Sequence, residues 1–315
     1  QVNSTIIDLY WSIGEYVSKQ IDVNGWGKST VKALSEYILS KEPGIRGYSS
    51  QNIWRMKQFY ETYKDKPELF GNPKTSVFPL LTKILDANDW LSVQVHPDDA
   101  YGLEHEGELG KTECWYIIDA EEGAEIIYGH KAKTKEELAS LIEAGDWDGL
   151  LSKTPVKKGD FFFVPSGTMH AIGPGILILE TQQSSDTTYR VYDFDRRDNQ
   201  GNKRELHIQQ SLDVLNLGYP ENSVPATVKT LQLESTCLTS NSFFTVYKWK
   251  LSGLVDFKQS APYLLCSVLS GNGTMTIDSR IYCLKKGDHF ILPNDVTDWE
   301  IDGQLEMIVS HPNEA

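Results

Sequence analysis

Several features that would assign a sequence to a specialised class are missing from these 315 residues. No run of about 18 apolar residues occurs, so we expect no membrane-spanning helix and no membrane partner. The first residues, Gln-Val-Asn-Ser-Thr, have neither the basic nor the apolar region of a secretory signal. The four cysteines include no C-x-x-C pair, which is typical of reduced thiols in a cytosolic protein. Together these absences predict a cytoplasmic globular protein.

Positive charge is also scarce. The chain has 30 Lys and Arg against 44 Asp and Glu, a net charge of −14, which argues against a surface that binds nucleic acid or anionic lipid throughout. The imbalance is uneven, because residues 1–70 carry a net +1 and the rest carries −15. With 40% hydrophobic residues the chain can bury a substantial core. Its length and this charge asymmetry predict more than one domain.

The hydrophobic period changes near Pro67. Before it, apolar residues recur every three or four positions, as in Ile6, Tyr10, Ile13 and Val17, and glycines and Pro43 interrupt the pattern. Residues 1–66 are therefore predicted to form three amphipathic helices. Beyond Pro67 apolar and polar residues alternate, which predicts many short strands and a barrel or sandwich.

Three of the predicted strands cover residues 90–96, 113–118 and 160–165, and one helical stretch, 135–149, interrupts them. A repeat supports a duplicated barrel. Residues 156–165 and 284–293 share the pattern K-K-G-D-x-F followed by two apolar residues and Pro, which is a tight turn entering a strand. Such segments look like the second motif of the cupin jelly roll, so we expect a mainly β fold with two cupin-like barrels.

Polar residues interrupt the apolar strands of the first predicted barrel at three places. Each one alone is more often an ordinary core or surface group. Two imidazoles, a carboxylate and a carboxamide on facing strands predict a divalent-metal site, for which Zn²⁺ is suitable and Fe or Mn remain alternatives. The three places are Ser92-Val-Gln94-Val-His96, whose polar side chains share one strand face, then Lys111-Thr-Glu113, and His170.

A fourth polar segment follows at residues 180–196. It contains Glu180, Asp186, Arg190 and Arg196, which could transfer protons and bind an anion beside the metal. The alternative is an ordinary solvated loop.

These segments resemble a known family. Q-V-H-P-D (94–98), G-K-T-E-C-W-Y (110–116), V-P-S-G-T-M-H-A (164–171) and L-E-T-Q-Q-S-S-D-T-T-Y-R-V-Y-D-F-D-R (179–196) are similar to type I mannose-6-phosphate isomerase. Residues 69–315 resemble its short bacterial form in particular. The resemblance implies a two-cupin enzyme that binds one zinc and interconverts mannose 6-phosphate and fructose 6-phosphate through an enediol.

The resemblance also implies roles for individual residues. The zinc ligands would be Gln94, His96, Glu113 and His170. The substrate would be bound by Ser92, Arg190 and Arg196, with both arginines near its phosphate. Lys111, Glu180 and Asp186, together with Arg190, would be catalytic. The second barrel has His289 and His311 without a comparable ligand set, so one zinc per chain is expected.

The N-terminal part departs from this family, whose usual W-G-G and G-E-x-W-x-x-S-x-H-P segments are absent. V-N-S-T-I-I-D-L-Y-W-S-I-G-E-Y (2–16) and Y-S-S-Q-N-I-W-R-M-K-Q-F-Y (48–60) instead resemble the helical N-terminal region of bacterial PD-(D/E)XK nuclease-like proteins. That region looks like a helix-turn-helix module, in which Arg55, Lys57 and Gln58 could meet DNA. A protein-interaction or purely structural segment is the alternative, and the nuclease catalytic region is not in this sequence.

We therefore predict a helical segment at 1–68, a zinc-binding cupin domain at 69–230 and a second cupin domain without metal at 231–315. The predicted function is a zinc-dependent sugar-phosphate isomerase. The alternative is a non-catalytic cupin remnant fused to a helical, DNA-associating, regulatory or interaction module.

Overall fold

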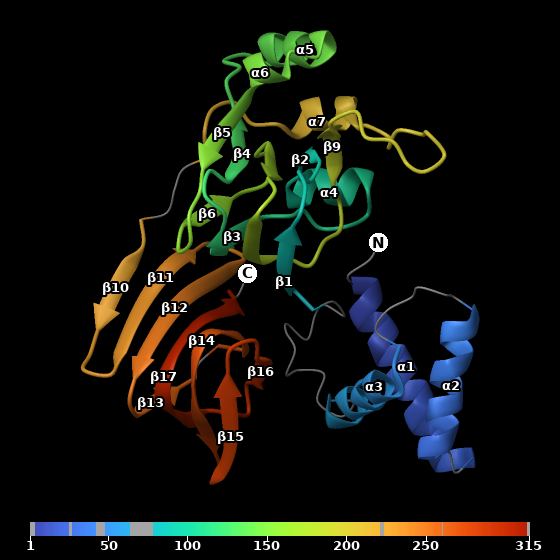
Figure 1. Cartoon of the computed structure of the whole chain (residues 1–315), viewed down its shortest axis with the longest axis vertical. Helices are drawn as coiled ribbons and strands as arrows, with labels where there is room; N and C mark the ends of the chain where they lie inside the picture. The colour runs from blue at the N-terminus through green and yellow to red at the C-terminus, as the bar shows by residue number, and fades with distance from the viewer. Residues whose placement is uncertain are drawn as a thin grey trace. The chain divides into compact units, whose positions relative to one another are not determined.

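The computed structural model (Figure 1) describes residues 4–24, 27–41, 48–63, 78–220, 224–259 and 261–313. The chain divides into two compact units, residues 1–78 and residues 79–315. The predicted join near residue 69 lies outside the described residues, and the predicted boundary between the barrels at residue 230 remains a prediction.

The described residues of the first unit form three helices, as the apolar spacing predicted. They are α1 (Ser4–Asn24), α2 (Lys28–Lys41) and α3 (Ser50–Tyr63). Among the side chains described in these helices, Val17, Val31 and Ile53 are fully buried in a small common core. This unit therefore has a core of its own.

Of the three residues that could meet DNA, one has a described side chain. Lys57 of α3 forms an ion pair with Glu61 and lies over the Trp54 ring. The side chains of Arg55 and Gln58 lie outside the described residues. The net charge of residues 1–70, only +1, predicts little affinity for nucleic acid, and this expectation stays a prediction.

The second unit is mainly β, and its first barrel is made of two antiparallel sheets. One sheet has four strands in the order β1 (Leu80–Ala87), β8 (Ile176–Gln183), β3 (Glu113–Ala120) and β6 (Phe161–Val164). The other has five in the order β5 (Leu151–Pro155), β4 (Glu125–His130), β7 (His170–Ile172), β2 (Val93–Val95) and β9 (Tyr189–Tyr192). Buried side chains from both sheets, including Ile117, Ile126, Ile172 and Ile178, form a common core. The strand predicted over 90–96 is shorter than expected, because β2 covers only Val93–Val95.

Short helices pack on the outer face of the five-stranded sheet. They are α4 (Asp99–His105), α5 (Lys135–Ala144), α6 (Trp147–Leu150) and α7 (Ile208–Val214). Leu138 of α5 and Leu150 of α6 are fully buried against Val93 and Ile127 of the sheet. The single helical stretch predicted over 135–149 is in fact two helices. Gly145, at φ 66°, ends α5 in the left-handed conformation that glycine adopts at low cost.

The second barrel is formed by one eight-stranded sheet (orange to red in Figure 1). Its strands are β10 (Ala226–Lys229), β11 (Leu233–Ser240), β12 (Phe244–Ser252), β13 (Val255–Lys258), β14 (Tyr263–Ile277), β15 (Arg280–Lys285), β16 (His289–Pro293) and β17 (Asp298–Pro312). The long strand β14 pairs with β16 through its first part and with β15 through its last part. Two features separate the two parts: a register shift that follows Val268, and Gly271, whose φ is 80°. A Cβ at position 271 would lie 1.8 Å from Gln304 O on the neighbouring strand β17, so this position requires glycine.

Both copies of the K-K-G-D repeat form the same turn. Asp160 accepts a hydrogen bond from Lys157 N at 2.9 Å, and Asp288 accepts the equivalent bond from Lys285 N at 2.8 Å. The glycine before each aspartate has a φ near 90°. The turns lead into β6 and β16, which confirms the predicted duplication of a turn and strand.

The two barrels share an apolar contact. Cys114 and Leu179 on the outer face of the four-stranded sheet pack with Phe244 and Val246 of β12. Tyr116 on the same face accepts a hydrogen bond from Lys248 at 2.6 Å. The barrels therefore form one compact unit.

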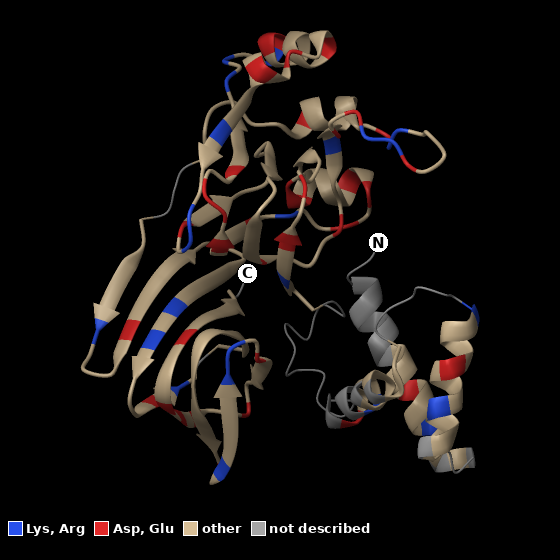
Figure 2. Cartoon of the chain, viewed as in Figure 1, with Lys and Arg blue, Asp and Glu red and all other residues tan. Residues whose placement is uncertain are grey.

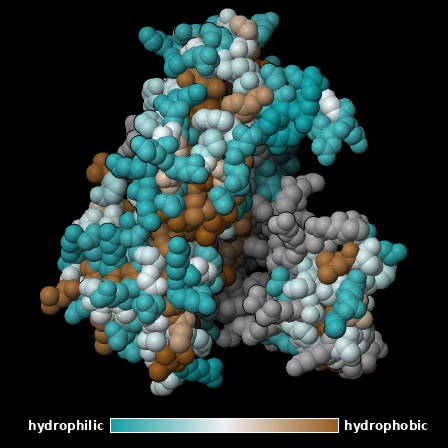
Figure 3. Space-filling view, viewed as in Figure 1, coloured by the Kyte–Doolittle hydropathy of each residue, from teal (hydrophilic) through white to brown (hydrophobic). Residues whose placement is uncertain are grey.

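The outer strand of the four-stranded sheet, β1, leaves apolar surface exposed. Ile84 of β1 is 44% exposed. In Figure 3 hydrophobic atoms gather near the middle of the β-rich unit, where Figure 1 has β1. Figure 2 shows acidic and basic residues interspersed on the strands of the second barrel, as in the pair formed by Lys229 and Glu234. Among the described helices, none is both long and apolar enough to cross a membrane.

Candidate metal centre

Two rows of polar side chains face each other inside the first barrel. On the five-stranded sheet, Gln94 of β2 is directly opposite His170 of β7 on one side and Arg190 of β9 on the other. Directly paired residues point to the same face of a sheet, so these three side chains share the inner face. On the facing sheet the register aligns Glu180 of β8 with Trp115 of β3.

Four predicted ligands converge between these rows. Glu113, the first residue of β3, has Oε2 at 3.4 Å from His96 Nε2 and Oε1 at 3.3 Å from His170 Nε2. The Gln94 carboxamide nitrogen lies 3.2 Å from the same His170 atom. A half-turn of the amide would present its oxygen instead. His96, Glu113 and His170 are each at most 1% exposed.

Backbone carbonyls orient both imidazoles. His96 Nδ1 donates to Thr187 O and His170 Nδ1 donates to Thr168 O, each at 2.9 Å. A carbonyl can only accept a hydrogen bond, so each Nδ1 carries the proton and each Nε2 keeps its lone pair. Both lone pairs consequently face the Glu113 carboxylate.

The electrostatics keep the imidazoles neutral and the carboxylate ionised. Burial, assisted by the charge of Lys111, lowers the pKa of His96 to about 3, and burial also lowers the pKa of His170. Burial alone would raise the pKa of Glu113, but the charge of Lys111 holds it well below its usual range. Neutral imidazoles and an ionised carboxylate are the protonation states that a metal requires.

These residues fit a divalent cation. Ligand atoms of His96, Glu113 and His170 all lie within 4.8 Å of one another, and no other such group of His, Cys, Asp and Glu occurs in the described ranges. The buried His96 Nε2 has no hydrogen-bond partner among the described residues. Buried acceptors that face one another are unfavourable unless a cation lies between them. The set of nitrogen and oxygen donors suits Zn²⁺.

Lys111 lies beside the group as a fixed positive charge. Its ammonium is 3.1 Å from Glu113 Oε2, and the residue is 5% exposed. Burial lowers the pKa of Lys111, but Glu113 and Glu180 outweigh burial and raise it. Lys111 is therefore protonated at neutral pH.

The pKa of Glu180 is shifted in the opposite direction from that of Glu113. Burial and the nearby Glu113 charge raise the pKa of Glu180. The Trp115 indole N–H lies 3.1 Å from both Glu113 Oε1 and Glu180 Oε2, and Lys83 is 3.3 Å from Glu180 Oε1. Two buried carboxyl groups with opposite shifts are a usual arrangement for acid–base chemistry.

Trp115 and Lys83 were not predicted from the sequence. Trp115 lies two residues after Glu113 within the segment G-K-T-E-C-W-Y, so period 2 already places it on the same strand face. Lys83 gives no such signal. Only the β1–β8 register, which sets it directly opposite Glu180, reveals its proximity.

The other residues predicted for the site lie at different distances from the cluster of His96, Glu113 and His170. Ser92 is 7% exposed and lies just before β2. Asp186 is near enough to Lys111 to help raise the pKa of that ammonium. Arg190 donates to Glu205 O at 2.8 Å, while its buried Nε has no hydrogen-bond partner among the described residues.

Arg196 is held differently. Its guanidinium donates to Trp90 O and forms an ion pair with Asp193. None of the described contacts of Arg196 joins it to His96, Glu113 or His170. The predicted phosphate contact of Arg196 stays a prediction.

The histidines of the second barrel lie apart from one another. His289 Nδ1 is 2.9 Å from Ser267 Oγ, and His311 Nδ1 is 2.9 Å from Pro312 O. Neither belongs to a metal-type group among the described residues.

Comparisons with known proteins agree with this geometry. Residues 233–312 match the family "Mannose-6-phosphate isomerase, cupin domain", and residues 1–76 match "DUF1016 N-terminal domain". A mannose-6-phosphate isomerase of Streptococcus mutans is 64% identical over 279 residues, which cover 89% of this chain and 88% of that protein. Mannose-6-phosphate isomerase ManA of Bacillus subtilis is 53% identical over 253 residues, 80% of each chain.

The fold agrees as well. The crystal structure of the mannose 6-phosphate isomerase from Bacillus subtilis superposes with a TM-score of 0.76 at 47% identity, covering 80% of this chain and 81% of that one. High identity over most of both chains and a shared fold accompany the convergent His96, Glu113 and His170. The chain belongs to the mannose-6-phosphate isomerase family of aldose–ketose isomerases.

Proposed function

We propose that this protein interconverts mannose 6-phosphate and fructose 6-phosphate and that it requires one Zn²⁺ per chain. The observation that carries the proposal is the convergence of His96, Glu113 and His170 within 4.8 Å, inside the first barrel of a chain from this family. Gln94 would complete a four-ligand shell. Bound zinc would act as a Lewis acid that polarises the substrate carbonyl and stabilises the oxyanion.

The reaction transfers a proton between C1 and C2, so the chain must provide a group that can release and accept a proton. We favour Glu180, because burial and Glu113 raise its pKa while Glu113 itself is held ionised. Asp186 is the alternative. Lys111 is unsuitable as a base, since the neighbouring carboxylates keep it protonated. As a buried cation it would instead stabilise negative charge on the substrate oxygens.

Trp115 would act as a positioning residue. Its indole N–H is shared between the proposed ligand Glu113 and the proposed base Glu180. A rigid, fully buried ring with one donor fixes the spacing of the two carboxyl groups.

Arg190 would bind the phosphate end of the substrate. It shares the inner face with Gln94, and its buried Nε is unpaired among the described residues, so a donor remains available for an anion. Fixing the phosphate converts remote binding energy into alignment of C1 and C2 with the base. Ser92 and Arg196 are proposed as further substrate contacts.

The test is a coupled assay of fructose 6-phosphate formation from mannose 6-phosphate by the purified chain, before and after removal of metal by a chelator. We expect activity that the chelator abolishes and that stoichiometric Zn²⁺ restores. A zinc-loaded, folded chain that forms no fructose 6-phosphate would instead favour the non-catalytic cupin remnant.

A further inference from the structure

A pocket, called the outer pocket below, lies on the opposite side of the five-stranded sheet from the candidate metal centre. It has a volume of about 730 Å³ and is bordered by α6, β5 and the end of β9. Lys153 of β5 lines it and is directly paired with Ile127 of β4. The next residue, Tyr128, pairs with His170 on the inner face. Successive strand residues point to opposite faces, so this outer pocket is separated from the metal centre by the sheet.

Stacked aromatic rings form one side of the outer pocket. The rings of Trp147 and Tyr192 are parallel within 16° at 4.2 Å, and those of Trp90 and Phe194 lie 5.6 Å apart. Tyr192 and Phe194, at 4.9 Å, join the two pairs into one surface. All four rings are only partly buried, so part of their apolar surface remains accessible to a ligand.

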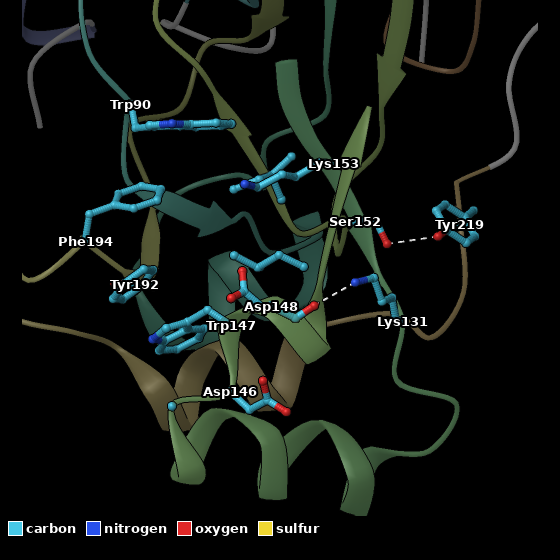
Figure 4. Close-up of a pocket in the computed structure, with 13 residues that line it drawn as sticks. Trp90, Lys131, Asp146, Trp147, Asp148, Ser152, Lys153, Tyr192, Phe194 and Tyr219 are labelled. Carbon is cyan, nitrogen blue, oxygen red and sulfur yellow. Dashed lines mark hydrogen bonds between the residues drawn. The ribbon is translucent and has the colours of Figure 1, made fainter. Parts of the chain in front are cut away.

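Charged groups complete the lining. Figure 4 shows the ammonium of Lys153 and the carboxylate of Asp148 pointing into the same space, between Trp90 and Trp147. Lys131 donates to the backbone oxygen of Asp148 at 2.7 Å and so ties the first turn of α6 to the segment after β4. Both signs of charge are therefore present beside the aromatic surface.

We propose that the outer pocket binds an unphosphorylated hexose unit of a neutral carbohydrate. A pyranose ring presents an apolar C–H face that stacks on aromatic rings, and a rim of hydroxyls that hydrogen-bond to carboxylates and ammonium groups. The outer pocket supplies both kinds of partner, and its volume is within the range usual for small-molecule sites. This role is separate from the isomerase reaction and does not depend on the metal.

The charges of the lining decide against two other ligand classes. A quaternary ammonium ion would favour an aromatic cage, but Lys153 already lies 5.9 Å from the Trp90 ring centre and would repel a second cation. A strongly anionic ligand would meet the carboxylates of Asp146 and Asp148. Hydroxyl groups, which both donate and accept, suit a lining of mixed charge.

The experiment titrates the intact chain with cellotriose, maltotriose or mannotriose and follows tryptophan fluorescence and saturation-transfer NMR. We expect saturable binding of at least one trisaccharide with a dissociation constant in the roughly millimolar range. Trp147→Ala should weaken it at least about tenfold, the loss expected for a ring that provides the stacking face. Asp148→Asn removes one exposed carboxylate without altering the packing and should weaken trisaccharide binding severalfold. Tyr282→Ala, which deletes an exposed ring on β15, is the matched control and should leave binding unchanged.

Saturating mannose 6-phosphate should not displace the trisaccharide, because the two ligands occupy opposite faces of the sheet. The proposal is overturned if none of the three sugars shows saturable binding up to about 50 mM. It is also overturned if Asp148→Asn and a folded Trp147→Ala both bind like the wild type, or if mannose 6-phosphate displaces the sugar.

Discussion

At the scale of single residues, the proposed metal centre depends on two imidazoles whose direction is set by backbone atoms. Thr187 O and Thr168 O hold the Nδ1 protons of His96 and His170, so neither ring needs a carboxylate to fix its tautomer. The nearby Glu113 carboxylate is thereby left to act as the proposed third ligand.

Removal of one imidazole should empty the site. We expect His170→Ala to lower the bound zinc from about one equivalent to nearly none, because two nitrogen ligands are needed beside Glu113. His289→Ala, in the second barrel, should keep its zinc. Metal analysis of the two purified variants checks this, and full zinc occupancy in His170→Ala would remove His170 from the shell.

Substitution of Arg190 should weaken binding of the phosphorylated substrate more than binding of zinc. Arg190→Ala should raise the KM for mannose 6-phosphate by an amount that corresponds to about 2–5 kcal/mol of binding free energy. Zinc affinity should stay near that of the wild type, and Arg280→Ala, which removes the same charge from β15, should change neither quantity. If KM and zinc affinity changed in parallel, Arg190 would have a structural role.

The raised pKa of Glu180 predicts how activity responds to pH. A base must be ionised to accept a proton, so kcat/KM should fall as the pH drops through a value above the ordinary glutamate pKa of 4.5. Glu180→Gln should lose roughly 10²–10⁴ of kcat and should no longer show that acid limb. Glu122→Gln, on an exposed turn, provides the comparison. An unaltered pH profile in Glu180→Gln would point to Asp186.

The sequence was sufficient to predict which polar residues converge in the first barrel but not what surrounds them. Gln94 and His96 are two residues apart, and period 2 places them on one face without knowledge of the fold. Lys83 and Glu180 are 97 positions apart, and only the register between β1 and β8 brings them together. Register depends on packing over the whole sheet, so it could not be predicted from local pattern.

At the scale of elements, the two K-K-G-D turns have the same structure, but the strands that follow them lie in different barrels, and only the first strand is next to the proposed metal ligands. The first leads into β6, where Val164 is directly opposite Glu113. The second leads into β16, which pairs with β14 in the other barrel.

Loss of either turn aspartate should cost about 1 kcal/mol of unfolding free energy, since each change removes one hydrogen bond to a backbone N–H. Only Asp160→Ala should also weaken zinc binding, because it loosens the strand beside Glu113. Chemical denaturation and zinc titration of Asp160→Ala and Asp288→Ala measure both effects. Equal zinc affinity in the two variants would show that the first turn does not support the metal centre.

Predictions of element type were more reliable than predictions of element length. The three N-terminal helices and the strands after Glu113 and Asp160 occur as predicted, because their apolar periods are long or end in clear turns. The strand predicted over 90–96 is limited to Val93–Val95, and Gly145 divides the predicted helix at 135–149. The division of the helix arises where the left-handed backbone of Gly145 overrides the side-chain pattern.

At the scale of the whole molecule, the helical unit and the β-rich unit have separate cores. The core of the first unit involves Val17, Val31 and Ile53, and every proposed ligand and substrate contact lies in the second. The metal chemistry is therefore expected to belong to residues 79–315 alone.

A protein truncated to residues 79–315 should retain one equivalent of zinc and most of its isomerase activity. The opposing effect is the exposed apolar surface of β1, where Ile84 is 44% exposed, since an uncovered edge strand promotes association. Size-exclusion chromatography with zinc analysis and the coupled assay separates the two outcomes. Aggregation that Ile84→Lys relieves would show that β1 requires a cover, whereas a soluble, zinc-free fragment would contradict the separation of roles.

The central claim is that an active chain holds one zinc ion between the two facing rows of the first barrel. Crystals grown from a batch that converts mannose 6-phosphate would be measured on both sides of the zinc absorption edge. The predicted result is a single anomalous peak per chain, at about 2.0–2.2 Å from the Nε2 atoms of His96 and His170 and from a Glu113 oxygen. A peak elsewhere in the molecule, or an active crystal with no peak at this position, would contradict it.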